Sequence, residues 1–206
     1  MPVRAVLFDL DGVLVESYEV WFSLLRALTQ ELGYPALTRE AFRAGWGQGI
    51  QADVETIFVR QTVPELERLY AERFGDHLAQ LAVAAGVPET FAALRARGLG
   101  SAVITNTPAS MAHALVARAG GTPDVLIGGT DVENAKPAPD MVLLACAKLG
   151  VSPGEAWVVG DTAYDRDAAR AAGAGFAGFG IDGDVRLASL ADLLPALEAR
   201  AARRDA

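Results

Sequence analysis

The chain has 206 residues, which fits one large domain or a core with an insertion, and its 51% apolar residues exclude a disordered chain. Its net charge of −8 disfavours nucleic acid and anionic membranes as partners, because both require clustered positive charge. The single cysteine, Cys146, excludes an internal disulfide framework, and because the sequence shows neither an apolar run of ~20 residues nor a signal peptide, we expect a cytoplasmic protein.

Short apolar runs and Pro-to-Gly helical segments alternate over much of the chain. Val3–Phe8 is apolar, rich in β-branched residues and followed by acidic residues and glycine, which is typical of a buried strand. Comparable runs are Ser101–Thr105, Asp124–Ile127, Ala156–Val159 and Gly175–Phe179. Helical patterns that open with proline and end before glycine are Pro88–Arg97, Pro108–Ala119 and Pro137–Leu149. This alternation predicts an α/β fold, a doubly wound parallel sheet with helices on both faces.

The interval after the first strand breaks this alternation. Apolar residues from Trp21 to Leu32 share one helical face, which ends at Gly33, and a second helical stripe follows Pro64. No strand pattern of similar quality occurs between residues 15 and 86. We therefore expect residues 1–14 and 87–206 to form the core and residues 15–86 to form an inserted, smaller helical domain.

Two pairs of carboxylates follow predicted strands. Asp9 and Asp11 are two residues apart, so they can face one site at the carboxyl end of the first strand, where open α/β sheets bind ligands. Asp161 and Asp165 follow a later strand at helical spacing, although Asp161 could also simply cap the next helix. Carboxylates that converge on one end of a sheet repel one another without a cation, and an oxygen-rich site favours Mg²⁺.

Polar groups at two further strand ends suit phosphate. Thr105 and Asn106 place a hydroxyl and an amide after a strand, although taken alone they are better explained by a plain helix cap formed by Asn106 or Thr107. Lys136 is one of only two lysines and precedes a Pro-opened helix, where it could neutralise a phosphate or an aspartate. The other lysine, Lys148, lies near a helix C-terminus and is expected to be a surface charge.

These motifs, in this order, resemble those of the haloacid dehalogenase (HAD) superfamily, over nearly the whole chain. The family's hhhDxDGT/V motif matches Val6–Val13, its Thr or Ser matches Thr105, its Lys-Pro matches Lys136-Pro137, and its GDxxxD motif matches Gly160–Asp165. The helical insertion resembles the family's helical cap, and the re-entry at Val87 resembles the phosphoglycolate-phosphatase-like branch. Glu16 departs from the Asp that this branch usually has, at a position that is not catalytic.

The resemblance implies roles for these residues. Asp9 would be the nucleophile that forms an aspartyl-phosphate, and Asp11 would be the general acid and base. Mg²⁺ would be held by Asp9, the Asp11 backbone carbonyl and Asp161, with Asp165 supporting the metal's waters or Lys136. Thr105, Asn106 and Lys136 would bind the transferring phosphoryl group. The implied activity is hydrolysis of a small phosphorylated metabolite, with phosphoglycolate as one candidate, by a monomer or weak homodimer.

Other functions stay open at this stage. A β-phosphoglucomutase-like phosphotransferase needs basic residues in the helical insertion for a second phosphate, and the insertion has arginines but no lysine. A non-catalytic receiver-like or degenerate scaffold is a different class, which turnover of a phosphate ester would exclude. Metal-free dehalogenation is disfavoured by Asp11 and Asp161, and Schiff-base chemistry by the lack of a lysine between residues 15 and 86.

We expect substrate selection in the segment Ala44–Gln51. Three glycines make a stable helix there unfavourable, and a mobile loop with a Trp and Gln could close over the leaving group. Trp46 and Gln48 are the candidate contacts, and Arg43 could pair with a substrate carboxylate, although a plain turn between helices is an equally good interpretation.

Overall fold

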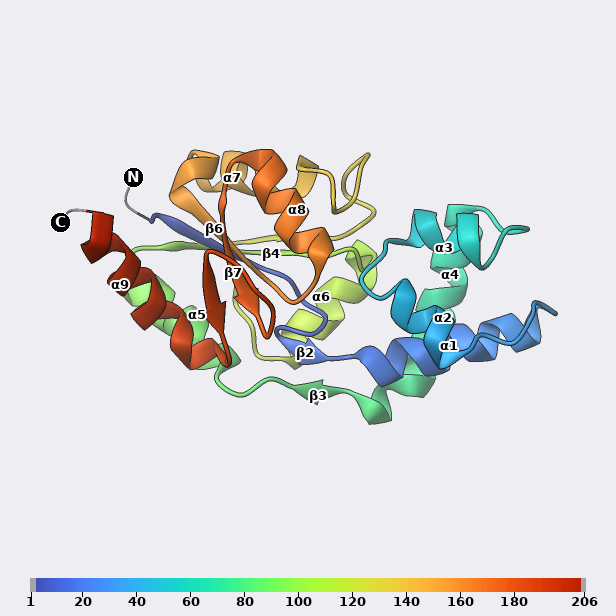
Figure 1. Ribbon diagram of the computed structural model, residues 1–206. Coiled ribbons are helices and arrows are strands. Elements are labelled where there is room, and N and C mark those ends of the chain that lie inside the picture. Colours follow the sequence, from blue (N-terminus) through green and yellow to red (C-terminus); the bar gives the residue numbers. More distant parts are fainter. Residues whose placement is uncertain (1–2, 205–206) are drawn as a thin grey trace.

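The computed structural model describes residues 3–204, and at its centre lies a six-stranded parallel sheet (Figure 1). The strands are β1 (Ala5–Phe8), β4 (Gly100–Ile104), β5 (Val125–Ile127), β6 (Ala156–Gly160), β7 (Gly175–Phe179) and β8 (Val185–Leu187), in the order β5-β4-β1-β6-β7-β8. The predicted doubly wound fold is confirmed, with β8 as a strand that the sequence did not predict. Because β1 lies between β4 and β6, the chain switches direction across the sheet at β1, which is where such sheets form a ligand crevice.

Helices cover both faces of the sheet (Figure 1). They are α5 (Val87–Ala96), α6 (Ala109–Arg118) and α9 (Leu193–Arg204) on one face, and α7 (Asp140–Leu149) and α8 (Ala163–Ala172) on the other. Successive side chains of β1 point to opposite faces of the sheet. Phe8 packs on Phe91 of α5 with ring centroids 5.3 Å apart, and Leu7 packs on the other face, in the cluster that includes α7 and α8. The sheet is therefore buried on both faces, which explains the continuous apolar character of its strands.

Helix boundaries agree with the sequence signals except at the start of α7. This helix begins at Asp140 rather than at Pro137. Ala138 precedes Pro139, and a residue before proline is disfavoured in the α conformation, so the helix starts only after the second proline.

The segment between β1 and α5 forms a helical lobe beside the sheet (Figure 1). Its elements are α1 (Tyr18–Glu31), α2 (Arg39–Ala44), α3 (Ile50–Thr56), α4 (Val63–Arg73) and the 3₁₀ helix Phe74–Gln80. The chain leaves and re-enters the core through β2 (Val15–Glu16) and β3 (Ala82–Val83), which pair as an antiparallel ribbon. Two further 3₁₀ turns, Pro153–Glu155 and Leu190–Asp192, lie in the core. The assignment of residues 15–86 to a separate cap domain stays a prediction.

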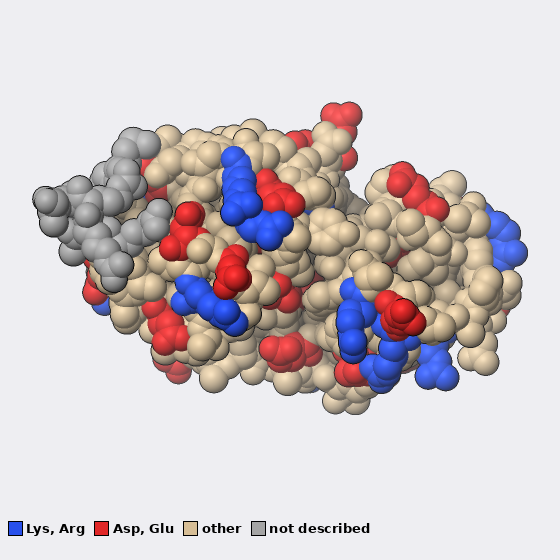
Figure 2. All heavy atoms as spheres, viewed as in Figure 1, with Lys and Arg blue, Asp and Glu red and all other residues tan. Residues whose placement is uncertain are grey.

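The visible surface has no single-sign charge field: acidic and basic side chains alternate over both parts of the molecule (Figure 2). The same view shows the surface hollowed between the helical lobe and the rest of the molecule. Among the described residues, no helix is both long and apolar enough to span a membrane.

The core of the helical lobe contains a buried carboxyl group. Asp53 of α3 is 7% exposed and accepts hydrogen bonds from the Tyr70 hydroxyl at 2.8 Å and from Gln48 Nε2 at 2.7 Å. Burial raises the pKa of Asp53 from 3.8 to about 6, against the opposing effect of these two hydrogen bonds. No basic side chain of the described residues forms an ion pair with it.

Asp53 therefore makes stability depend on pH. Well below pH 3.8 the group is protonated in both the folded and the unfolded chain, and as the pH rises from 3.8 to 6 the unfolded chain loses its proton while the folded chain largely keeps it, so the free energy of unfolding falls over this range. Above pH 6 the buried carboxylate then costs the fold about 3 kcal/mol relative to the unfolded chain.

We predict that Asp53→Asn raises the free energy of unfolding at pH 8, because the amide keeps the hydrogen-bonding shape without the buried charge. The gain should be smaller at pH 5 than at pH 8 by about 1.4 kcal/mol, and urea unfolding of both proteins at the two pH values measures it. The exposed Glu55→Gln change on the same helix is the control and should show no such difference. A gain that is equal at both pH values would contradict the assignment.

Candidate active site

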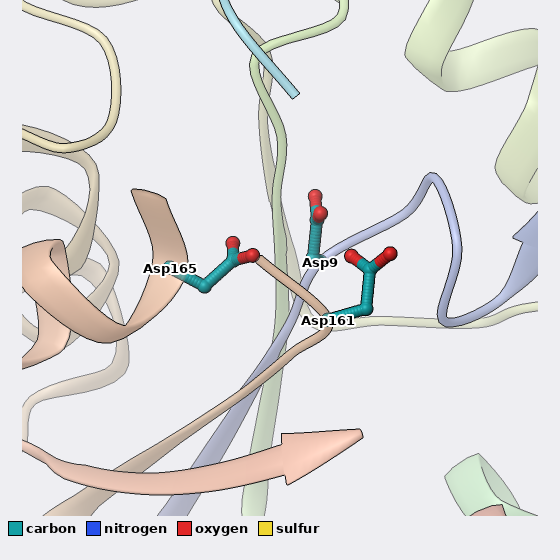
Figure 3. Close-up of side chains that lie close together, drawn as sticks. All are labelled: Asp9, Asp161 and Asp165. Carbon is teal, nitrogen blue, oxygen red and sulfur yellow. The ribbon is translucent and has the colours of Figure 1, made fainter. Parts of the chain in front are cut away.

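Three carboxylates converge at the carboxyl ends of β1 and β6. Asp9 directly follows β1, Asp161 directly follows β6, and Asp165 lies in the first turn of α8. Figure 3 shows that the three side chains gather around one point, and each offers an oxygen within 4.8 Å of the others. The parallel pairing of β1 with β6 brings together residues that are about 150 positions apart in the sequence.

Lys136 compensates part of this negative charge. Its ammonium group is buried and lies 2.8 Å from Asp9 Oδ1, 2.6 Å from Asp165 Oδ1 and 3.1 Å from the Ile104 carbonyl oxygen. Burial alone would lower the pKa of Lys136, but the carboxylates of Asp165 and Asp9 outweigh burial and raise it above its usual range. Lys136 is thus a fixed cation paired with two aspartates, and its predicted contact with phosphate stays a prediction.

One cation does not balance the site. Burial, and next the negative charge of Asp165, raise the pKa of Asp9 well above its usual range and that of Asp161 to about 7. Asp161 Oδ1 is buried and has no hydrogen-bond partner in the described part of the chain. A buried, unpaired carboxylate oxygen is costly, so this site needs a positive partner that the described residues do not supply.

The donor set fits Mg²⁺. Asp9 and Asp161 offer oxygen ligands, and oxygen-only sites favour a hard cation. Gly12 closes the loop after β1 directly over Asp161, because a Cβ at Gly12 would lie 2.1 Å from Asp161 Oδ2. Gly12 also has a φ of +84°, so both space and backbone conformation require glycine there.

Four donors hold the carboxylate of Asp11. Ser17 Oγ and Trp21 Nε1 donate to Asp11 Oδ1, the indole at 3.0 Å. Thr107 Oγ1 donates to Asp11 Oδ2 at 2.6 Å, and Thr105 Oγ1 lies 3.3 Å from the same oxygen. Because the donors come from the helical lobe on one side and from the end of β4 on the other, both parts of the molecule orient this group.

The side chain of Asn106 joins three segments instead of projecting into the cavity alone. Its Nδ2 donates to the carbonyl oxygens of Gly47 at 2.8 Å and Lys136 at 2.9 Å, and its Oδ1 accepts from the Lys136 N–H at 2.9 Å. The amide therefore links the end of β4, the lysine loop and the turn between α2 and α3.

A cavity of about 360 Å³ connects these groups to the helical lobe. Asp9, Asp11, Thr105, Asn106 and Lys136 line its core side. Trp46 and Gln48 line its lobe side, in the turn that the glycines of Ala44–Gln51 predicted between two short helices. Arg43 is exposed and is not among the lining residues, so the structure does not bring it to the other candidates.

Sequence reasoning missed five residues that face or support this cavity. Thr107 and Ser17 bind Asp11. The available signal was a hydroxyl residue shortly after a strand end: Ser17 follows the DxD motif, and Thr107 follows β4. Trp21 and Tyr70 were assigned only to apolar helix faces, which hides the polar end of each side chain. Asp53 carried no signal, because a lone acid in a short helix is ordinarily exposed.

Comparisons with known proteins agree with this geometry. The family model described as haloacid dehalogenase-like hydrolase matches residues 6–179. N-acetylmuramic acid 6-phosphate phosphatase of Pseudomonas aeruginosa is 32% identical over 180 residues, covering 84% of this chain and 80% of that protein. Phosphoglycolate phosphatase of Chromobacterium violaceum is 33% identical over 182 residues, covering 83% and 82%.

A solved structure supports the same assignment. CbbY from Rhodobacter sphaeroides, in complex with phosphate, superposes with a TM-score of 0.80 at 28% identity, covering 95% of this chain and 99% of that one. The fold, the matched family model and the two phosphatase relatives together show that the chain belongs to the haloacid dehalogenase-like hydrolases and is a phosphoric monoester hydrolase.

Proposed function

We propose that this phosphatase hydrolyses a small phosphorylated metabolite through a phosphoaspartyl intermediate on Asp9, with Mg²⁺ as its cofactor. The observation that carries the proposal is the pair Asp9 and Asp11, which line one cavity and are held in different ways. Asp9 is buried and anchored through Oδ1 by Lys136 and by the Leu10 N–H at 2.7 Å. Asp11 is held by four neutral donors and faces the same cavity.

The two carboxyl groups divide the chemistry. An Asp9 carboxylate oxygen attacks phosphorus and the ester P–O bond breaks, while protonated Asp11 gives its proton to the leaving alkoxide. Asp11, now a carboxylate, takes a proton from water as the water oxygen attacks the phosphoaspartyl group. The bond between phosphorus and Asp9 then breaks, which releases inorganic phosphate and restores both carboxyl groups.

A bound cation and the surrounding polar groups would stabilise the negative charge of the phosphoryl group. Asp9, Asp161 and the Asp11 backbone carbonyl would hold Mg²⁺, which supplies electrostatic stabilisation of the phosphoryl oxygens and of the crowded carboxylates. Asp165 keeps Lys136 in place beside Asp9. Thr105 contributes a side-chain donor to the phosphoryl group, and Lys136, whose ammonium is bound to Asp9, Asp165 and the Ile104 carbonyl, contributes its positive charge beside the nucleophile. Asn106 contributes its backbone N–H, because its side-chain amide is engaged elsewhere.

The phosphotransferase alternative gains no support from the cavity. Holding a second phosphate requires further positive charge, and of the described residues that line the cavity only Lys136 is basic. Phosphoglycolate, which the name of the Chromobacterium violaceum relative gives as its substrate, is the candidate substrate that the sequence suggested. Whether it fits depends on the side chains that line the lobe side of the cavity.

We predict that chelation with EDTA lowers hydrolysis of p-nitrophenyl phosphate by at least ~100-fold and that excess Mg²⁺ restores it, since metal stabilisation is worth several kcal/mol. Asp161→Asn should raise the Mg²⁺ concentration for half-maximal rate. Asp167→Asn is the matched control, because Asp167 pairs with Arg166 outside the cluster, and it should leave that concentration unchanged. Full activity of rigorously metal-free protein would refute the cofactor assignment.

We predict that Asp9→Asn abolishes turnover, because the amide is not a nucleophile. Asp11→Asn should lower the rate on alkyl phosphates by ~10²–10⁴-fold, as is typical for loss of a general acid and base. The loss in the rate of enzyme phosphorylation should be smaller with p-nitrophenyl phosphate, whose leaving group needs no proton, and a rapid-quench measurement resolves this step. Equal losses on both esters would show that Asp11 does not protonate the leaving group.

We predict that Lys136→Met costs far more activity than Lys148→Met, because only Lys136 contacts the nucleophile. Lys148 is exposed near the end of α7 and serves as the control. Removing Lys136 also leaves Asp9 and Asp165 without their cation, so the free energy of unfolding should fall by ~3–5 kcal/mol. Circular dichroism and urea unfolding identify conditions under which Lys136→Met is folded, and wild-type activity there would exclude the proposed role.

A further inference from the structure

The lobe side of the cavity is apolar apart from one polar cluster. Aromatic and aliphatic side chains cover most of it, among them Trp21, Leu25, Phe42 and Ile50. The cluster consists of Gln48, Asp53, Thr56 and Tyr70, which also line the cavity. Gln48 and Tyr70 donate to the Asp53 carboxylate, and Gln48 Nε2 lies 3.4 Å from Thr56 Oγ1. A leaving group that occupies this end of the cavity therefore meets one carboxylate, one amide and two hydroxyls in otherwise apolar surroundings.

The Asp53 carboxylate has capacity for a further donor. Each of its two oxygens accepts one hydrogen bond within the described part of the chain, and a carboxylate has about four acceptor sites. A hydroxyl or N–H of a ligand could donate to one of the remaining acceptor sites of Asp53, whereas a negatively charged ligand group has no proton to donate there.

No free cation in the described structure offsets Asp53 within the cavity. Lys136 is the only basic residue in the lining, and its ammonium already contacts Asp9, Asp165 and the Ile104 carbonyl. The arginines nearest along the chain are engaged or exposed elsewhere. Arg39 pairs with Glu19, Arg60 donates to the Leu32 carbonyl and lies over the Tyr34 ring, and Arg43 is exposed on α2.

The fold itself gains little from this carboxylate. A buried acid without a cationic partner costs stability wherever it is ionised, and an asparagine could make hydrogen bonds of the same shape. A destabilising ionisable group in the wall of a cleft that carries reactive groups is the pattern expected of a ligand-contacting residue.

We propose that Asp53, supported by Gln48 and Tyr70, selects phosphate monoesters of neutral alcohols whose leaving group presents a hydroxyl or N–H donor, and that it rejects leaving groups with a carboxylate or a second phosphate. This inference rests on the proposed phosphatase function and narrows its substrate class. Discrimination of this kind needs a repulsive element as well as an attractive one, and Asp53 supplies both. Phosphoglycolate carries a carboxylate and is therefore a poor substrate for this enzyme.

Two pairs of esters that differ mainly in charge test the proposal. Glycerol 3-phosphate is compared with 3-phosphoglycerate, and 2-hydroxyethyl phosphate with phosphoglycolate, at pH 8, with Mg²⁺ in excess. Each compound is measured as a substrate and as a competitor of p-nitrophenyl phosphate, so that a weakly hydrolysed compound still gives a binding constant. We expect the wild-type enzyme to prefer the neutral member of each pair by at least ~10-fold, since opposed like charges are strongly unfavourable.

Asp53→Asn should reduce that preference by at least ~5-fold through better binding of the anionic esters, while the Mg²⁺ concentration for half-maximal rate changes little. Glu55→Gln removes the same charge from the same helix outside the cavity and should leave the preference intact. Equal use of both members by the wild type, or a preference that Asp53→Asn leaves unchanged, would overturn the role of Asp53. Absence of any p-nitrophenyl phosphate hydrolysis would instead refute the phosphatase proposal.

Discussion

The excess of negative charge at the carboxyl ends of β1 and β6 is the constraint on which the rest of the site depends. Asp9, Asp161 and Asp165 lie within reach of one cation, yet within residues 3–204 only Lys136 forms ion pairs with them, and it is bound to Asp9 and Asp165. Breaking such a buried ion pair typically costs ~3–5 kcal/mol, so the contacts that hold the lysine loop, β1 and α8 together also fix Asp9, the proposed nucleophile. The unpaired oxygen of Asp161 is where the remaining charge demands an added cation.

The helical lobe takes part in the site as well as covering it. Ser17 and Trp21, at the start of the lobe, orient Asp11 together with Thr105 and Thr107 from the sheet. The Asn106 side chain binds the Gly47 carbonyl and so fastens the α2–α3 turn to the core. Asp11, the proposed general acid, and the cavity wall formed by the α2–α3 turn are therefore positioned by contacts that cross between the helical lobe and the core.

Much of the core could be predicted because its signals are local. Apolar runs that end in Asp, Thr or Lys are strands whose carboxyl ends meet at one edge, and this rule brought Asp9, Asp161, Thr105 and Lys136 together before any contact was known. The start of α7 was misplaced because Pro137 and Pro139, two positions apart, both resemble helix openings. The weak strand β8, only three residues long, gave too short a pattern to recognise.

The sequence by itself therefore determined the doubly wound core, the helical insertion and the acidic and basic groups at the strand ends, because strand and helix periodicity and turn residues act over a few neighbouring positions. Only the tertiary structure decided the character of the leaving-group end. Gln48, Asp53 and Tyr70 come from a turn and two helices, and their contacts depend on how α3 packs against α4. The charge and acceptor capacity of Asp53 matter because packing of the helical lobe buries this side chain, and no described arginine of the lobe forms an ion pair with it. Burial of this kind is a property of packing, and no local pattern of residues encodes it.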